Sequence, residues 1–158
     1  DFAHFLSVSD SYVAVVDHDN EQIKLYNRHT RHVTDITLPN TIPIFNMCFT
    51  SDGSLLVTSW KKGHDSVTDN GSEDDSDDYS DSDDHRYLLT KYRVEPESAS
   101  GGAALTQLWS VAEDDAVCGV AESENGLIFL CGVDNKTIYI YSGEGAYVRF
   151  FINILDFT

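Results

Sequence analysis

The chain has 158 residues, and 27 acidic against 10 basic side chains give it a formal net charge of −17. A hydrophobic fraction of 41% is enough for a folded core, so wholesale disorder is excluded. No stretch approaches 18 apolar residues, which excludes a membrane-spanning helix, and the strong negative charge argues against binding to a nucleic-acid backbone.

Short runs rich in Val, Ile, Tyr, Phe and Thr follow one another along the chain, and turn signals such as Asp52-Gly53, Asn125-Gly126 and Ser142-Gly143 separate them. Such runs are typical of strands. No run with helical periodicity exceeds two turns, so the sequence predicts an all-β chain. The expected strands are 5–8, 12–16, 22–26, 33–38, 44–50, 55–59, 87–93, 105–111, 117–121, 127–131, 137–141 and 147–152.

The strands recur as a repeated unit of a Ser-acid step, a turn, an apolar strand, a polar loop and a strand that ends in Tyr. The acid and the Tyr are 16 residues apart in the first copy and 17 in the third, but 40 in the second. The pairs are Asp10 and Tyr26, Asp52 and Tyr92, and Glu124 and Tyr141. The excess in the second copy places an acidic insertion between two of its strands, and the recurring tyrosines are interpreted as packing residues.

The acids of the first two copies are 42 residues apart, and four short strands in about 40–50 residues are the signature of a β-propeller blade. We therefore expect a β-propeller fragment of three four-stranded antiparallel blades: 1–40, 41–112 with a disordered acidic insertion at 61–86, and 113–153, followed by the start of another blade at 154–158. Three blades do not close a ring, and about six is the first estimate for a complete one. The open blade faces predict self-association.

The block from Asp65 to Asp84 contains ten acidic residues and no basic one. Low hydrophobicity and like-charge repulsion favour a solvated, disordered loop. Two alternatives are a docking loop for a basic protein surface, which would act through electrostatic steering, and a weak calcium site, although the EF-hand positions for Gly and Glu are missing. An acid follows three residues after each of three candidate phosphorylation sites, Ser66, Ser72 and Ser80.

Candidate partner contacts combine basic positions near the first repeat with this acidic block. They are Arg28, Arg31, Asp74, Asp75, Asp77, Asp78 and Tyr79. The expected partner is a protein with a basic surface, and neither a nucleic acid nor a membrane is expected.

Three cysteines, Cys48, Cys118 and Cys131, lie within apolar runs. We expect three buried thiols in a reducing compartment, which favours a cytoplasmic location. A disulfide between Cys118 and Cys131 on neighbouring strands is the alternative.

Residues 117–152 carry a Gly-Val-Ala step at 119–121, Asn125-Gly126 before an apolar strand, the run Ile138-Tyr139-Ile140-Tyr141, and Gly145 before the last strand. This pattern resembles an NHL repeat. Propellers of that type often form the C-terminal part of tripartite-motif ubiquitin ligases, in which they recognise a substrate or RNA. The resemblance implies substrate recognition rather than catalysis by this chain, and the acidic charge argues against RNA.

No order of carboxylate, His and nucleophile suggests a triad, and no phosphate-binding or nucleophile-elbow motif occurs. We therefore predict no catalytic residues, no metal ligands and no cofactor. Two other classes stay open: an extracellular or scaffold propeller with a calcium-binding acidic loop, and part of a metal-dependent propeller hydrolase, which would need inward carboxylates or histidines in each blade.

Overall fold

The computed structural model describes residues 5–38, 43–61, 86–96, 102–134 and 136–152. Within these residues the chain forms three four-stranded antiparallel sheets. The first sheet contains β1 (Leu6–Val8), β2 (Tyr12–Asp17), β3 (Gln22–Asn27) and β4 (Val33–Thr37). The second contains β5 (Ile44–Phe49), β6 (Leu55–Lys61), β7 (Arg86–Glu95) and β8 (Ala104–Glu113), and the third contains β9 (Val117–Glu122), β10 (Ile128–Gly132), β11 (Thr137–Tyr141) and β12 (Tyr147–Ile152).

The prediction of an all-β chain with these strands is confirmed, and each sheet is a simple meander in chain order, as expected for a propeller fragment. The largest difference lies in β7 and β8, which are both longer than predicted. They pair from Tyr87 with Glu113 to Glu95 with Ala104, across a register shift at Lys91 and Tyr92. The described part of the chain has no helix long and apolar enough to cross a membrane.

Three turns that join paired strands, β5–β6, β9–β10 and β11–β12, share one hydrogen-bonding pattern. In the β5–β6 turn the Thr50 amide donates to the Ser54 carbonyl at 2.9 Å, and the Gly53 amide donates to the Thr50 carbonyl at 2.9 Å. Gly53 has a φ of 79°, a left-handed conformation that glycine adopts without strain. The turn predicted at Ser142-Gly143 is the β11–β12 turn, and its left-handed residue is Gly145 (φ 80°).

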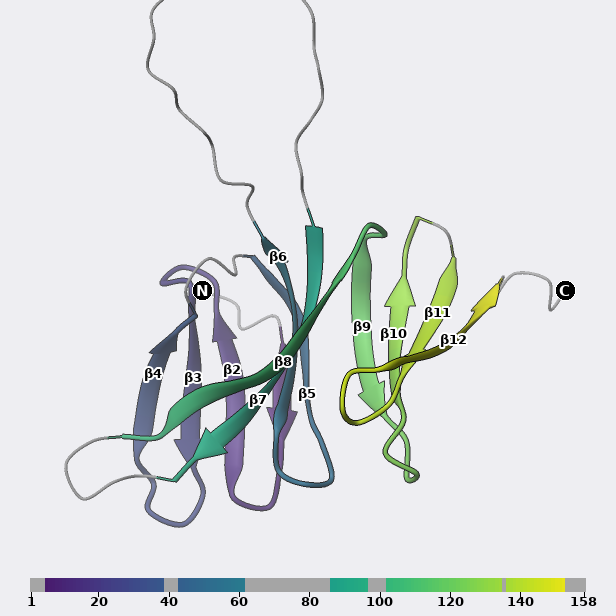
Figure 1. Ribbon diagram of the computed structural model, residues 1–158. Helices are drawn as coiled ribbons and strands as arrows, with labels where there is room; N and C mark the ends of the chain where they lie inside the picture. The colour runs from purple at the N-terminus through teal and green to yellow at the C-terminus, as the bar shows by residue number, and fades with distance from the viewer. Residues whose placement is uncertain (1–4, 39–42, 62–85, 97–101, 135, 153–158) are drawn as a thin grey trace, which may run out of the picture.

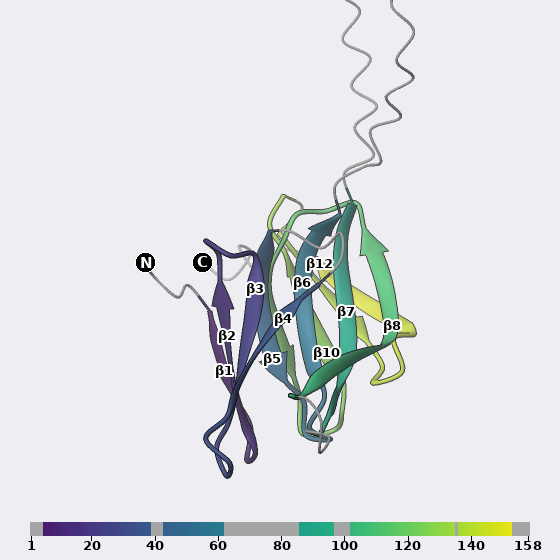
Figure 2. The ribbon, with the colours of Figure 1, turned by 90° about the vertical axis from the view of Figure 1, so that its left-hand side faces the viewer.

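The second sheet lies between the other two (Figure 1), and Figure 2 shows the same stack with the first sheet nearest the viewer. The first strands of the sheets are neighbours, because β5 packs against both β1 and β9. The Phe49 amide donates to Ser7 Oγ at 2.8 Å on one side, and Asn46 Nδ2 donates to the Cys118 carbonyl at 3.1 Å on the other. This arrangement of first strands is the one expected along the inner wall of a propeller.

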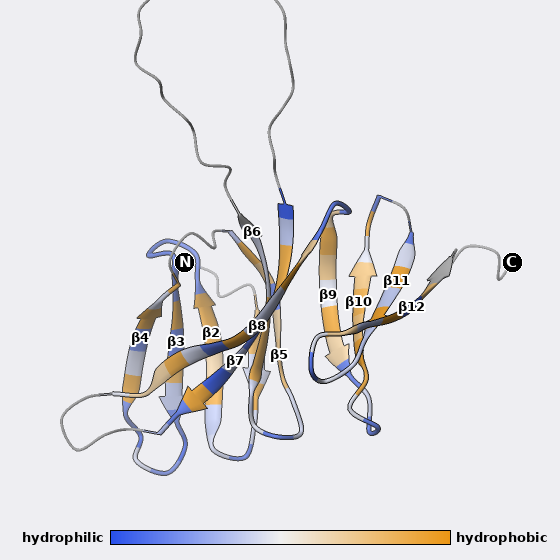
Figure 3. Cartoon of the chain, viewed as in Figure 1, coloured by the Kyte–Doolittle hydropathy of each residue, from blue (hydrophilic) through white to orange (hydrophobic). Residues whose placement is uncertain are grey.

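Two apolar clusters join the sheets, and β6 contributes to both. Leu55 and Val57 belong to the cluster shared with the first sheet, whereas Leu56 belongs to the cluster shared with the third. All three side chains are at most 1% exposed. A strand with both faces covered reads as a continuous apolar run, which explains the Leu-Leu-Val sequence and the hydrophobic colouring of the sheet junctions in Figure 3.

The recurring tyrosines occupy one register position in the three sheets. Tyr92 pairs with Leu55 and is 5% exposed in the first junction, and Tyr141 pairs with Ile128 and is 2% exposed in the second. The interpretation as packing residues is therefore confirmed for Tyr92 and Tyr141. Tyr26, at the same position of the first sheet, is only half-buried.

The expectation of three buried cysteines is wrong, because Cys118 is exposed and Cys48 and Cys131 are only partly buried. The register of β9 and β10 shifts at Cys131 and Gly132, and this irregularity places Cys118 between the paired positions. All three cysteines are free thiols. Burial raises the pKa of the Cys131 thiol, and a hydrogen bond with Cys118 raises it further.

Candidate functional site

The connections between strands gather at two opposite ends of the stack (Figure 1). At the upper end of that view lie the β2–β3, β8–β9 and β10–β11 connections, together with the end of β6 at Lys61 and the start of β7 at Arg86. The β1–β2, β3–β4, β5–β6, β9–β10 and β11–β12 connections lie at the lower end.

The upper end is acidic in all three sheets. Its described acidic residues are Asp17, Asp19, Glu21, Glu113, Asp114, Asp115 and Asp134. Basic residues near them include Arg86, Lys136 and Lys24, whose ammonium lies 3.2 Å from Asp17 Oδ2. The acidic segment of the sequence connects β6 to β7, so the strands that flank it end on the same side. A surface with one predominant sign of charge attracts partners of the opposite sign.

The buried carboxylate of Asp115 forms two hydrogen bonds at this end. Its Oδ2 accepts a hydrogen bond from the Tyr139 hydroxyl at 3.0 Å, and its Oδ1 accepts one from the Asp134 amide at 3.0 Å. The side chain is 3% exposed, and a Cβ at Gly132 would collide with its carboxylate. Asp115 therefore holds the β8–β9 and β10–β11 connections together, which positions the exposed carboxylates of Asp114 and Asp134.

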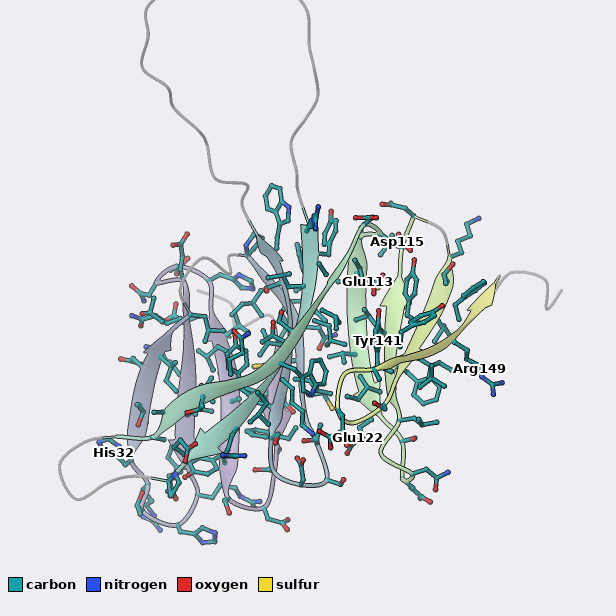
Figure 4. All side chains as sticks on the ribbon, viewed as in Figure 1. His32, Glu113, Asp115, Glu122, Tyr141 and Arg149 are labelled. Carbon is teal, nitrogen blue, oxygen red and sulfur yellow. The ribbon has the colours of Figure 1, made fainter. Side chains whose placement is uncertain are left out.

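Glu113 lies beside this carboxylate at the end of β8 (Figure 4). Burial raises the pKa of its side chain, and the charges of Asp114 and Asp115 raise it further. The ionised carboxylate is therefore less stable here than it would be in water, and a cation bound at this end would stabilise it.

The acidic residues of this end do not form a metal site in the described part of the chain, where no group of three or more His, Cys, Asp or Glu side chains could hold an ion. Asp115 uses its two oxygens for Tyr139 and the Asp134 amide. The calcium alternative concerns residues 73–84, which lie outside the described residues.

Arg28 and Arg31 lie at the lower end, in the β3–β4 turn. Arg28 Nη1 donates to the Ser9 carbonyl at 2.9 Å and to the Asp10 carbonyl at 3.2 Å, so this side chain braces the β1–β2 turn. Arg31 has a φ of 63° and its side chain is exposed. The other candidate contacts, Asp74, Asp75, Asp77, Asp78 and Tyr79, and the candidate phosphorylation sites Ser66, Ser72 and Ser80 lie outside the described residues.

A groove of about 450 Å³ opens at the lower end between the first and second sheets. It is lined by residues 8–12 of the first repeat, by the β5–β6 turn and by Val94. Two of its polar side chains take part in turn hydrogen bonds, since Ser9 Oγ accepts from the Tyr12 amide at 3.0 Å and Thr50 Oγ1 donates to Asp52 Oδ1 at 2.6 Å.

An ion pair within the second sheet, between the buried Lys91 and the half-exposed Asp52, lies beside the junction with the third sheet at this end. Lys91 Nζ lies 2.8 Å from Asp52 Oδ2, and the Trp109 indole donates to the Gly143 carbonyl at 3.1 Å. Burial opposes ionisation of Asp52, but hydrogen bonds from Lys91, Thr50 and Ser54 outweigh it and hold the pKa of this carboxyl well below its ordinary value. The Ser-acid step of the second repeat therefore has a structural role.

The acidic residues in the short upper connections are not among the partner contacts that were predicted from the sequence. The repeat itself was the signal that could have identified them, because the connection between the second and third strands must leave every sheet at the same end. Asp19 and Glu21 in the first sheet and Asp134 in the third occupy that connection, as the acidic segment does in the second.

No protein-family model and no curated protein sequence matches the chain. Among solved structures it is similar to a protein of unknown function from Bacteroides caccae, with a TM-score of 0.51 and 9% sequence identity. The match covers 95% of this chain but 45% of the other. The similarity therefore concerns the fold, and the chain spans less than half the length of this neighbour.

Proposed function

We propose that this chain is the protein-interaction region of a β-propeller, and that its acidic upper end binds a basic surface on a protein partner. The observation that carries the proposal is the presence of acidic side chains in the upper connections of all three sheets. The strands below them are held by two buried clusters, so the carboxylates stand on a rigid support.

Binding begins with long-range attraction between the acidic end and the basic partner, which raises the association rate and falls as salt increases. On contact, cations of the partner neutralise Asp114, Asp134 and the destabilised carboxylate of Glu113. Asp115 stays fixed by Tyr139 and acts as a positioning residue.

The finer proposal is an NHL-type propeller that recognises substrates for a tripartite-motif ubiquitin ligase in the cytoplasm. Its supports are the repeat pattern of residues 117–152, the four-stranded sheets and the three free thiols. The acidic end favours a protein over RNA as the partner, because RNA binding needs basic contacts to phosphate.

The test compares two charge reversals with the same change in net charge. Asp19→Lys with Asp134→Lys alters the upper end, and Glu124→Lys with Glu144→Lys alters exposed positions at the lower end. Binding of a Lys-rich peptide is measured by titration calorimetry at low and moderate salt. We expect the upper variant to lose about tenfold in affinity relative to the lower one; equal losses would show that only net charge matters and would refute the proposed site.

The ligase role is tested on the full-length protein. Ubiquitination of a captured partner should fall with the upper variant and persist with the lower one. A partner that binds normally to the upper variant contradicts recognition through this end.

A further inference from the structure

The start of β9 departs from the regular alternation of a strand. Val117 and Val120 both pack in the cluster shared with the second sheet, although they are three residues apart. In a regular strand, side chains three residues apart point to opposite faces. The register gives the reason: Val117 and Gly119 pair with consecutive residues of β10, which leaves Cys118 unpaired between them in a β-bulge.

The bulge turns the side chain of Cys118 toward Cys131. In a regular strand pair, Gly119 and its partner Cys131 would face one side of the sheet and Cys118 would face the other. Here the thiols of Cys118 and Cys131 are hydrogen-bonded to each other, because a bulge re-aims a side chain. Gly119 has no side chain to separate them, and a Cβ at that position would lie 3.7 Å from Cys131 Cβ. The two thiols therefore meet on one face of the third sheet.

The hydrogen bond gives the two thiols different roles. Burial raises the pKa of the Cys131 thiol, and the hydrogen bond with Cys118 raises it further. A hydrogen bond that raises the pKa of a thiol is made by its protonated form, so Cys131 donates and Cys118 Sγ accepts. When one of the two thiols ionises, the negative charge therefore resides on Cys118. The thiolate is the nucleophilic form of cysteine, which makes Cys118 the first of the pair to react.

We propose that hydrogen peroxide converts Cys118 and Cys131 into a reversible disulfide, which fastens the β8–β9 connection to the β10–β11 connection. In the first step the Cys118 thiolate attacks one oxygen of the peroxide. An S–O bond forms, the O–O bond breaks, and the departing hydroxide takes up a proton and leaves as water. In the second step the Cys131 sulfur attacks the Cys118 sulfenic acid: the S–S bond forms, the S–O bond breaks, and the hydroxyl group leaves as water with the Cys131 proton. Both thiols are oxidised and the peroxide is reduced to water.

The cysteine pair lies directly beside the two connections that it would fasten. β9 begins and β10 ends at the upper end of the stack (Figure 1). There the Val133 amide donates to the Ala116 carbonyl at 2.7 Å, and the Asp134 amide donates to Asp115 Oδ1 at 3.0 Å. A disulfide would add a covalent bond to these hydrogen bonds, so the two connections would open less often.

Both thiols belong to one sheet, so their separation depends on the register of β9 and β10 and not on any part of the chain after residue 152. A disulfide of this kind also suits a reducing compartment, where disulfides are usually transient and redox-sensing. Cys48 provides the comparison within the chain. It lies on β5, its Sγ donates to the Phe49 carbonyl at 3.2 Å, and burial raises the pKa of its thiol. We therefore expect Cys48 to stay reduced.

The experiment treats the reduced full-length protein with increasing concentrations of hydrogen peroxide and then alkylates the remaining thiols. A protease that cuts after Glu122 and Glu124 separates the two cysteines, so mass spectrometry detects the disulfide as two linked peptides. We expect Cys118 to be linked to Cys131 and Cys48 to be alkylated. Dithiothreitol added after the peroxide should restore both thiols of the pair.

Three serine variants separate the steps. Cys131→Ser removes the second thiol, so Cys118 should stop at the sulfenic acid, and its labelling by dimedone should be about tenfold higher than in the native protein. Cys118→Ser should leave Cys131 as a thiol under the conditions that oxidise the native pair. Cys48→Ser is the matched control and should form the disulfide as the native protein does. Circular dichroism and thermal unfolding verify that each variant is folded.

The fastening of the two connections is measured by amide hydrogen exchange of residues 114–117 and 132–134. Exchange there should be slower in the oxidised than in the reduced native protein, because a cross-linked segment opens less often. Cys118→Ser treated with the same peroxide should show no difference.

The proposal is overturned if peroxide leaves Cys118 and Cys131 unlinked, whether they stay thiols, become sulfinic acids or bond to Cys48 or to another chain. Equal hydrogen exchange in the oxidised and reduced protein would refute the fastening of the two connections. None of these outcomes bears on binding at the acidic end, which is tested separately with the Lys-rich peptide.

Discussion

Replacement of Leu56 by Ala tests whether the third sheet is held to the rest of the fold by its buried junction. Leu56 is 0% exposed and belongs to a cluster of six buried residues that includes Val117, Ile128, Leu130 and Tyr141 of the third sheet. A Leu-to-Ala change at such a site costs the transfer free energy of the lost methyl groups plus the cost of the cavity, together about 3 kcal/mol.

The assay is urea unfolding followed by circular dichroism at one protein concentration. With a slope of about 2 kcal/mol per molar urea, the midpoint should fall by about 1.5 M. Leu6→Ala is the control, because Leu6 is 62% exposed and its truncation in the monomer should change stability by less than about 0.5 kcal/mol. If Leu56→Ala and Leu6→Ala have the same midpoint, the cluster does not join the second and third sheets as described.

Three further predictions concern the turns and the charged groups. Gly145→Ala should destabilise the chain by about 1–2 kcal/mol more than Gly53→Ala, since both glycines have positive φ but only at Gly145 would the new Cβ meet an indole ring; equal thermal midpoints would contradict this. Asp52→Ala should cost about 3 kcal/mol and Lys91→Met much less in urea unfolding, because the first leaves a buried ammonium unpaired whereas the second leaves a carboxylate that is 55% exposed. Glu113→Gln should stabilise the chain at neutral pH and make no difference at low pH. The pKa of Glu113 is raised in the folded state. The stability that this carboxyl contributes is therefore fully present at pH values below its ordinary pKa and is lost as the pH rises through its raised pKa. A difference that is largest in acid would contradict the cause assigned to that shift.

The strand positions could be predicted because their information is local. The alternation around Val13 and Val15, the turn glycine Gly53 and the repeated Tyr each depend on a few neighbouring residues. The repeat spacing then identified an insertion between β6 and β7 from chain length alone. Errors occurred where local pattern was insufficient, as at Cys118, because a register shift between strands cannot be read from one strand.

The charged residues at the two ends of the molecule also show what the sequence can predict and what only the fold decides. Arg28 was a candidate contact on the basis of its charge, yet its guanidinium braces the β1–β2 turn through carbonyls 18 and 19 residues away in sequence. Asp134 and Asp114 were not candidates, although Asp115 brings their two loops together. Charge is visible in a sequence, but the end of the fold on which a charge lies depends on strand direction.

The sequence by itself determined an all-β chain, its twelve strands and their grouping into three repeated units, because strand propensity, turn chemistry and repeat spacing are short-range properties. Only the tertiary structure decided that the second sheet is buried on both faces while Tyr26 and Phe129 stay accessible, and that Asp115 holds the β8–β9 and β10–β11 connections together. These features depend on which sheet lies beside which, and side chains far apart in the chain acquire a common environment only when the sheets pack.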